Sequence, residues 1–279
     1  MLVFLATILV NLSFALLVRA AQRRGVDVVA SGVVNYAFAA VTYWVIVLVT
    51  GTPYAPEAPR IGVTAGVFYV STYLLLLPAM RIRGVAIAMG FVRLSVVIPL
   101  IAAVVVWHEA PGPVKQVGIA LALLALPLLS LDGGANSAPL TRRNLIILLG
   151  LFLTNGTCLL MGKWFQSTGL VAERLLYLAI VYSTAALLFV AALPLLPKAR
   201  FGAAELRWGA LIGLCNCTAN VLMLYTLDLF LASVVFPIIA AVNLSLATVF
   251  AAVTWREIPG RLGWTGISVA VLAVILANT

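Results

Sequence analysis

The stretch Trp107–Leu126, WHEAPGPVKQVGIALALLAL, decides how the whole chain is organised. It returns 148 residues later as Trp255–Val274, WREIPGRLGWTGISVAVLAV. Nine of the twenty aligned positions are identical, against roughly two expected by chance in a chain so rich in Ala, Leu and Val. The identical pairs are Trp107/Trp255, Glu109/Glu257, Pro111/Pro259, Gly112/Gly260, Gly118/Gly266, Ile119/Ile267, Ala122/Ala270, Leu124/Leu272 and Ala125/Ala273. The chain therefore contains an internal duplication.

The composition is that of a membrane protein. Of the 279 residues, 64% are hydrophobic and 9% are charged, and the mean hydropathy is +1.18. Soluble domains carry about 25% charged residues, so a soluble core could not hide this much apolar surface. The net charge of +9 is spread singly between apolar runs. Such Lys and Arg residues orient membrane loops, and we expect no nucleic-acid partner.

Apolar runs near the length of a membrane span occur ten times, and Gly, Pro or charge separates them. The predicted spans are 2–19, 28–49, 61–80, 84–106, 114–131, 144–164, 172–194, 208–227, 230–254 and 261–277. Prolines and glycines make residues 51–59 a predicted loop. The longest polar stretch, 132–143, is the predicted linker between a first five-helix repeat, 1–131, and a second, 144–279.

The similarity of the two halves extends beyond the opening motif. At an offset of 144, Asn11 falls on Asn155 and Gly25 on Gly169. At an offset of 147 the pairs are Gly62/Gly209, Gly66/Gly213, Tyr69/Asn216 and Tyr73/Asn220. Because five is odd, the second repeat enters the membrane in the opposite orientation, so we predict an all-α membrane protein of two inverted five-helix repeats. Inverted repeats place a substrate site near the bilayer midplane, at the interface between halves.

The basic residues predict which side of the membrane each loop occupies. Twelve of them follow odd-numbered spans and four lie on the opposite side. The positive-inside rule then puts the odd-numbered loops in the cytoplasm and both termini outside. The first group is Arg19, Arg23, Arg24, Arg81, Arg83, Arg142, Arg143, Lys198, Arg200, Arg207, Arg256 and Arg261; the second is Arg60, Lys115, Lys163 and Arg174.

The repeated motif resembles the drug/metabolite transporter superfamily, in particular its EamA-like ten-helix branch. Members end each unit's fourth helix in a G-E-R-x-x-P-like turn before a glycine-containing fifth helix. The matching residues are Glu109, Pro111 and Gly118 in the first half, then Arg256, Glu257, Pro259 and Gly266 in the second. The resemblance implies a transporter of metabolites or drugs, and we expect it in a bacterial inner membrane, as a monomer or homodimer.

Arg93 is the sharpest single signal of a binding site. It lies near the middle of the predicted fourth span, where a charge costs at least about 2.5 kcal/mol on insertion scales. Such a residue normally turns inward, toward a partner or a water-filled cavity. It could bind an anionic group such as a carboxylate or phosphate, or it could pair with helix carbonyls and fix the fold.

Amides and tyrosines inside the spans form the second signal. A buried amide needs a partner on another helix or a polar cavity. Asn216 and Asn220 share one helix face, and Tyr69 and Tyr73 share the equivalent face of the other half. Helix–helix hydrogen bonding is the alternative explanation for each amide taken alone. The predicted substrate-binding residues are Arg93, Tyr69, Tyr73, Asn216, Asn220, Asn155, Asn11, Asn243, Tyr36 and Tyr182. Pro99 and Pro237 interrupt their spans and are predicted hinges.

The acidic residues narrow the possible functions. No Asp or Glu lies in the middle of a predicted span, which disfavours a pump for cationic drugs because such a pump needs an intramembrane carboxylate. An intramembrane lipid-processing enzyme is the alternative of a different class, yet the sequence has no H-E-x-x-H, G-x-S-x-G or paired-Asp pattern. We therefore expect a transporter of a small polar, carboxylate-bearing metabolite, with no catalytic residue, metal or cofactor.

Overall fold

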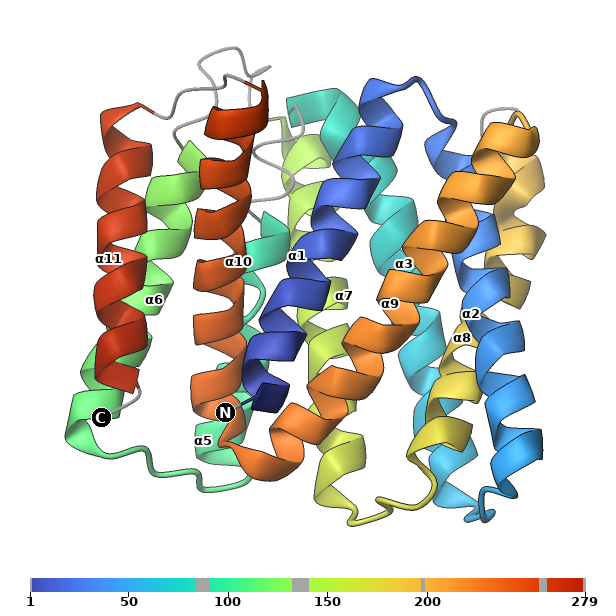
Figure 1. The fold of residues 1–279 in the computed structure, drawn as a ribbon, viewed down its shortest axis with the longest axis horizontal. Coiled ribbons are helices and arrows are strands. Elements are labelled where there is room, and N and C mark those ends of the chain that lie inside the picture. Colours follow the sequence, from blue (N-terminus) through green and yellow to red (C-terminus); the bar gives the residue numbers. More distant parts are fainter. Residues whose placement is uncertain (1, 84–90, 132–140, 197–198, 256–259, 278–279) are drawn as a thin grey trace. The chain divides into compact units, whose positions relative to one another are not determined.

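The computed structural model describes residues 2–83, 91–131, 141–196, 199–255 and 260–277, and their regular elements are all helices (Figure 1). In chain order these are α1 (Leu2–Arg23), α2 (Val28–Thr50), α3 (Glu57–Arg83), α5 (Val97–Val105), α6 (Pro113–Leu131), α7 (Arg142–Ser167), α8 (Arg174–Ala192), the short 3₁₀ helix η1 (Leu193–Leu195), α9 (Ala203–Leu229), α10 (Ala232–Trp255) and α11 (Arg261–Ala277).

Seven of the described helices are long and apolar enough to cross a membrane, namely α1, α2, α3, α7, α8, α9 and α10. Three shorter apolar helices, Phe91–Val105, Pro113–Leu128 and Arg261–Leu276, lie where the other predicted spans are. The chain is thus all-helical over the described residues, and its helices are consistent with an integral membrane protein.

Two helices begin earlier than the apolar runs predict. The expectation that residues 51–59 form a loop is wrong at its end, because α3 begins at Glu57. Pro59 falls in the first turn of α3, where backbone N–H groups have no partner inside the helix, so its missing donor costs no hydrogen bond. Similarly, α9 begins at Ala203, five residues before the predicted start, with Glu205 in its first turn.

Several predicted features lie outside the described residues. They are residues 84–90 of the predicted fourth span, residues 132–140 of the linker, Lys198 of a predicted cytoplasmic loop, and Arg256, Glu257 and Pro259 of the second motif. The first copy of the motif is described, and its Glu109 is buried at 9% exposure.

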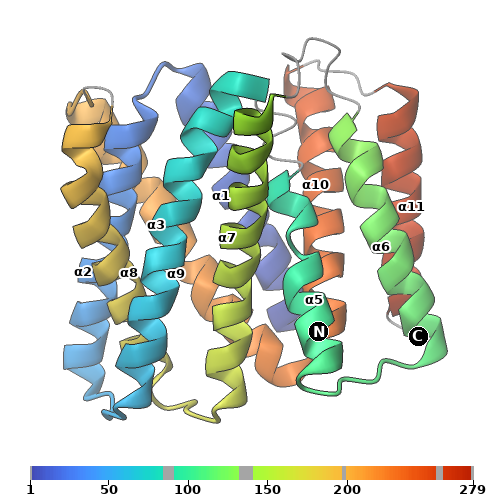
Figure 2. The ribbon, with the colours of Figure 1, turned by 180° about the vertical axis from the view of Figure 1, so that it is seen from behind.

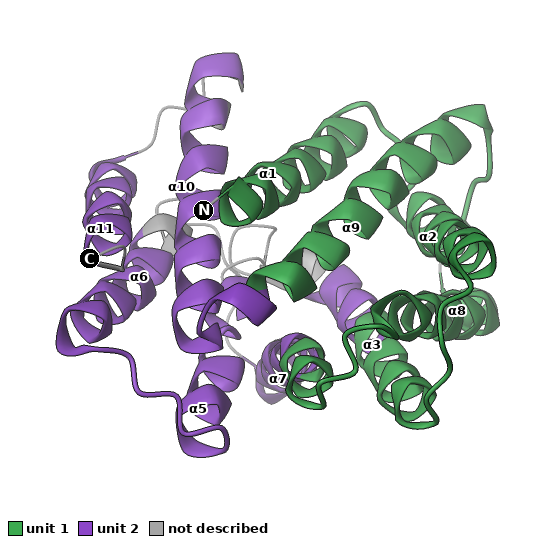
Figure 3. Ribbon diagram, turned by 60° about the horizontal axis from the view of Figure 1, so that its bottom comes forward, with its two compact units in different colours: residues 1–70, 161–226 green, residues 71–160, 227–279 purple. Residues whose placement is uncertain are grey.

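The chain divides into two compact units, shown in different colours in Figure 3. Unit 1 comprises Met1–Val70 and Met161–Thr226, and unit 2 comprises Ser71–Leu160 and Leu227–Thr279. Each unit therefore takes segments from both predicted repeats, and the boundary falls inside α3, α7 and α9. The division of the sequence into repeats 1–131 and 144–279 stays a prediction.

In unit 1, α2 packs along α8, and glycines allow two further helices to come close to this pair (Figures 1 and 2). A Cβ atom added at Gly66 of α3 would lie 2.6 Å from both Thr184 Cβ and the Val181 carbonyl oxygen of α8. One added at Gly213 of α9 would lie 3.0 Å from the Asn35 carbonyl oxygen of α2. Glycine pairs four residues apart are a common means of close helix approach in membranes.

The two glycine contacts are reciprocal. One helical turn before these glycines, Gly62 meets Ile180 of α8, and Gly209 meets Val34 of α2. Gly209 follows Gly62 by 147 residues, and Ile180 follows Val34 by 146. The glycines of α3 thus contact α8, and the glycines at the matching positions of α9 contact α2.

Unit 2 has its own core. The helices α6 and α11 pack against each other, and α10 packs on α5, α6 and α11 (Figures 1 and 2). Elsewhere in this unit, Ala79 of α3 forms a buried cluster with Leu148 and Leu151 of α7. Close to this cluster, α7 approaches α5 at Gly156, where a Cβ atom would overlap Ile98.

Carboxylates end or begin helices instead of lying within them. Asp27 caps α2, because its Oδ1 accepts from Val29 N and Ala30 N at 2.9 and 3.0 Å. Glu109 caps α10: its Oε1 accepts from Ala232 N at 3.2 Å, and its Oε2 accepts from Ser233 N and Ser233 Oγ at 2.8 Å. Glu109 of the repeated motif therefore caps a helix that lies far from it in the sequence.

Candidate polar site and its comparison with known proteins

A group of tyrosine rings surrounds Tyr182 in unit 1. The Tyr182 side chain is fully buried. Its ring centroid lies 6.1 Å from that of Tyr36, 5.6 Å from that of Tyr43 and 5.8 Å from that of Tyr69. Distances and tilts in this range are those of favourable aromatic pairs. The cluster joins α2, α3 and α8.

A chain of hydrogen bonds connects this cluster to the asparagines of α9. Tyr69 Oη donates to Asn220 Oδ1 at 2.6 Å, and Asn220 Nδ2 donates to Tyr182 Oη at 2.7 Å. The Asn220 amide also donates to Asn216 Oδ1 at 2.9 Å, and Asn216 Nδ2 donates to Asn35 Oδ1 at 3.2 Å. Polar groups from four apolar helices therefore satisfy one another, as burial in a nonaqueous environment requires.

The network has a closed end and an accessible end. Asn35, Tyr36 and Tyr182 are buried, whereas Tyr69, Asn216 and Asn220 are half-buried. A solute could exchange hydrogen bonds with the half-buried groups while the buried groups hold them in place. The predicted shared faces of α3 and α9 thus meet in one network through Tyr69, Asn216 and Asn220.

Sequence reasoning missed Tyr43. Its hydroxyl donates to the Cys217 carbonyl oxygen at 2.6 Å, and its side chain is 1% exposed. The available signal was its position seven residues after Tyr36, two helical turns along the same face of α2. Phe189 follows Tyr182 by the same interval, and its ring lies 5.9 Å from that of Tyr36.

Asn11 lies in unit 1 but has a local partner. Its Nδ2 donates to the Thr7 carbonyl oxygen at 2.8 Å, one turn earlier in α1. The Thr7 hydroxyl in turn lies 2.8 Å from the Thr226 hydroxyl of α9. This pair joins α1 to α9, and Asn11 belongs to the half-buried face of α1 beside it.

Arg93 belongs to unit 2 and lies in the apolar helix Phe91–Val105. Its Nε is buried and has no hydrogen-bond partner among the residues that the structure describes. An unpaired guanidinium donor in an apolar environment is costly.

The helix that carries Arg93 is interrupted directly after it. Ser95 and Val96 form a turn, and Val96 N donates to the Arg93 carbonyl oxygen at 3.4 Å instead of to Val92, four residues back. Asn155 Nδ2 from α7 donates to the Val92 carbonyl oxygen at 3.0 Å and to Ser95 Oγ at 2.5 Å. In this structure Asn155 therefore caps the freed carbonyl at the break.

The two predicted hinge prolines have different settings. Pro99 is the third residue of α5, directly after the break, so its missing N–H removes no bond from the helix. In a regular helix the N–H of residue 99 would donate to the Ser95 carbonyl oxygen. Here Ile98 N donates to that oxygen at 3.0 Å, so the carbonyl has a donor without Pro99. Pro237 lies inside α10, which continues through it. Only Pro237 leaves an interior carbonyl, that of Ser233, without its usual helical donor.

Two further polar side chains in unit 2 have a buried atom without a hydrogen-bond partner among the described residues. They are Asn243 Oδ1 on α10, in a side chain 2% exposed, and Thr72 Oγ1 on α3. The half-buried Tyr73 also belongs to this unit. Buried acceptors normally find a donor from protein, water or ligand. Of the predicted site residues in unit 2, Arg93 and Asn243 thus have a buried polar atom without a hydrogen-bond partner among the described residues, whereas Asn155 is hydrogen-bonded.

The described residues contain no group of three or more His, Cys, Asp or Glu side chains placed to hold a metal ion. Cys158, Cys215 and Cys217 form no disulfide bond.

Comparison with known proteins defines the fold alone. No family model matches the chain, and no curated protein sequence matches it. A solved structure described only as the crystal structure of a protein is similar over 99% of this chain and 95% of its own, with a TM-score of 0.73 at 14% identity. The same arrangement of helices therefore occurs in another protein of closely similar length.

Proposed function

We propose that the protein is a secondary transporter that moves a small polar metabolite bearing a carboxylate, such as an amino acid, by alternating access. In this proposal the seven long and three shorter apolar helices all cross the membrane, as two inverted five-helix repeats related to the EamA-like branch of the drug/metabolite transporters. The odd-numbered loops face the cytoplasm of a bacterial inner membrane.

The reciprocal glycine contacts support the inverted repeat. If the two halves are related by a two-fold axis in the membrane plane, a contact from the third helix of one half to the second helix of the other must occur twice. The contacts of Gly66 with α8 and of Gly213 with α2 are such a pair. The ring pairs Tyr43–Tyr182 and Phe189–Tyr36 are another, because each residue lies 146 positions from its counterpart. Transporters with this symmetry bind solutes between their repeats.

The functional proposal is carried by Arg93, whose buried Nε has no hydrogen-bond partner in the part of the chain that the structure describes. A buried guanidinium with an unused donor fits an acceptor with two oxygens, such as a carboxylate, which neutralises the charge and accepts the hydrogen bond. The interruption at Ser95–Val96 places Arg93 at the end of a helical segment, as in transporters that bind solutes at broken helices.

A hydrogen-bond acceptor without a donor fits the ammonium group of an amino acid. An ammonium group carries three donors and no acceptor. Asn243 Oδ1 is buried without a donor among the described residues, and α10, which carries it, packs against α5. In unit 1, the half-buried Tyr69, Asn216 and Asn220 stay predicted solute contacts on the evidence of their own helices.

Export of cationic drugs is less well supported. Such a solute needs a carboxylate within the membrane, and each described Asp or Glu lies at or beyond a helix end. Glu109, which is buried, already accepts three hydrogen bonds at the start of α10. An amine substrate would have to displace these bonds.

Flux into proteoliposomes tests the proposal. The purified chain is reconstituted, and uptake of radiolabelled amino acids and dicarboxylates is compared for the native protein, Arg93→Ala, Arg93→Lys and Arg142→Ala. Arg142 is an exposed arginine at the start of α7 and serves as the control. We expect flux of at least one anionic or zwitterionic solute, lost in Arg93→Ala, reduced in Arg93→Lys and kept in Arg142→Ala.

Thermal shifts separate binding from folding in the same set of variants. A solute at a hundred times its Kd stabilises the protein by about 2.7 kcal/mol. If folded Arg93→Ala keeps every anion-dependent shift of the native protein, Arg93 is structural and the proposed carboxylate site is wrong. If no carboxylate-bearing solute is transported or shifts the native melting temperature, the proposed substrate class is wrong.

A further inference from the structure

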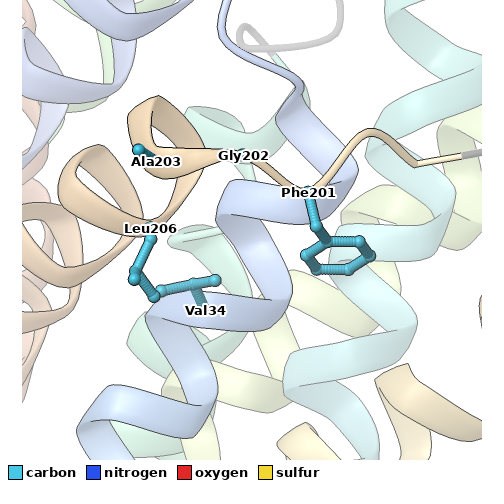
Figure 4. A pocket seen from close by; sticks show the side chains of 5 residues that line it. All are labelled: Val34, Phe201, Gly202, Ala203 and Leu206. Carbon is cyan, nitrogen blue, oxygen red and sulfur yellow. The ribbon is translucent and has the colours of Figure 1, made fainter.

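An open apolar hollow lies at the start of α9, and its lining residues are not members of the polar network. Its walls are Val34 of α2 and Phe201, Gly202, Ala203 and Leu206 (Figure 4). The Val34 and Leu206 side chains point toward each other, and the Phe201 and Leu206 side chains are exposed. Its volume of about 240 Å³ falls below the roughly 300–1,000 Å³ of pockets that enclose a drug-sized ligand. The hollow therefore suits one segment of a flexible apolar chain.

Hydrogen bonds hold the walls of this hollow at one end of unit 1. The Asp27 backbone N donates to Glu205 Oε1 at 3.3 Å, and the Arg200 backbone N donates to Asp27 Oδ2 at 3.2 Å. The Arg24 guanidinium lies over the Trp208 ring, 5.0 Å from its centroid. A tryptophan and an arginine at the end of apolar helices are typical of the membrane–water boundary.

Two basic residues adjoin the lining of the hollow in the sequence, Arg200 next to Phe201 and Arg207 next to Leu206. Arg200 and Arg207 are exposed, and neither guanidinium has a hydrogen-bond or ion-pair partner among the described residues. Two carboxylates lie nearby, but Asp27 accepts three backbone N–H groups and Glu205 accepts the Asp27 N–H. Three arginines, Arg24, Arg200 and Arg207, therefore outnumber two carboxylates that already have donors.

We infer that this hollow binds an anionic phospholipid, with part of an acyl chain against Val34, Phe201 and Leu206 and with the headgroup phosphate on Arg200 and Arg207. Arginine forks match phosphate oxygens, and basic pockets at the ends of membrane helices bind anionic headgroups. A zwitterionic lipid would fill the same hollow but adds a positive group beside the arginines. The inference does not depend on transport, because it uses only the hollow and its charges.

Native mass spectrometry of the full chain in detergent tests the inference. Palmitoyl-oleoyl phosphatidylglycerol and palmitoyl-oleoyl phosphatidylcholine are titrated separately, and the fraction of lipid-bound protein is measured. We expect phosphatidylglycerol to bind more tightly, and Arg200→Gln/Arg207→Gln to lower its affinity roughly thirty-fold, since each arginine contributes about fivefold. Binding of phosphatidylcholine, whose phosphate is accompanied by a choline cation, should fall by less in this variant.

Two controls locate the site. Arg142→Gln/Arg143→Gln removes two exposed arginines at the start of α7 and should leave phosphatidylglycerol binding intact. Ala203→Trp fills the hollow and keeps every arginine, so it should weaken binding, whereas Leu214→Trp, at another exposed position of α9, should not. Equal loss in both arginine pairs would mean general surface attraction. Unchanged binding in Ala203→Trp, or equal affinity for the two lipids, would overturn the inference.

Discussion

Tyr36 and Tyr182 lie 146 residues apart in the chain, and their ring centroids are 6.1 Å apart inside unit 1. Each ring also contacts the aromatic residue seven positions after the other: Tyr182 stacks on Tyr43, and Tyr36 meets the edge of Phe189. The four rings thus form two matched pairs. The pairs differ in one hydroxyl, since Phe189 stands where the other pair has Tyr43. The Tyr43 hydroxyl donates to the Cys217 carbonyl oxygen.

Removing the Tyr69 hydroxyl should weaken the network around these rings. In Tyr69→Phe, the half-buried Asn220 Oδ1 loses a donor that lies 2.6 Å away. We expect a loss of about 1 kcal/mol in the free energy of unfolding, measured by denaturant titration in detergent micelles. Tyr54→Phe is the matched control, since that side chain is 72% exposed. Similar losses in both variants would contradict a stabilising role for the Tyr69–Asn220 bond.

Alanine at Gly66 should be costlier than alanine at Gly213. The new methyl group would lie 2.6 Å from Thr184 Cβ and from a backbone carbonyl in the first case, but no closer than 3.0 Å to its neighbours in the second. We expect Gly66→Ala to destabilise the protein by about 1–3 kcal/mol and Gly213→Ala by less.

Thermal unfolding of the two glycine variants measures this difference. Gly112→Ala is the control, because a methyl group there would meet no atom within 4 Å. The close-packing argument fails if Gly66→Ala melts at the same temperature as Gly112→Ala.

Loss of the Glu109 carboxylate should destabilise the start of α10. In Glu109→Ala, the N–H groups of Ala232 and Ser233 and the Ser233 hydroxyl lose their acceptor. We expect a cost of about 2 kcal/mol, since these are hydrogen bonds to a buried charged group. A double-mutant cycle with Ser233→Ala should give coupling of at least about 0.5 kcal/mol. The exposed Glu57 provides the comparison: Glu57→Ala should change stability by less than about 0.5 kcal/mol.

The two prolines should behave differently if a hinge exists. Pro237→Ala restores a helical donor for the Ser233 carbonyl, so α10 should become stiffer, the melting temperature should rise and solute flux should slow. Pro99→Ala should change flux little, because Pro99 lies in the first turn of α5. Flux assays on both variants test whether Pro237 is a hinge. A flux in Pro237→Ala equal to that of the native protein would exclude a hinge at Pro237.

Much of the helical architecture could be predicted because the apolar runs and the repeat are strong signals. The run 28–49 became α2, Val28–Thr50, since Asp27 and Gly51 mark its ends in the sequence as they do in the structure. The starts of α3 and α9 were misplaced because prolines and glutamates are favourable in first helical turns, where they resemble loop residues.

The site could be predicted only in part. Helical spacing on α9 correctly suggested that Asn216 and Asn220 share a face, and their network includes Tyr69, Tyr36 and Tyr182. Spacing cannot show what a polar group meets across a helix interface. For Asn155, a predicted solute contact, spacing did not reveal the bond to the Val92 carbonyl at the break in the neighbouring helix. Tyr43 was missed because a single tyrosine in an apolar run carries no sign of its partner.

The reciprocal glycine contacts have a consequence for any attempt to divide the chain. Cutting at the polar segment between the predicted repeats would give two fragments, one ending with α6 and one beginning with α7. The first would keep Asn35, Tyr36 and Tyr69, and the second would keep Tyr182, Asn216 and Asn220. Neither fragment contains both sides of a reciprocal glycine contact or the complete hydrogen-bond chain between Tyr69 and Asn35. Each should therefore be degraded when expressed alone, and co-expression of the pair should rescue both.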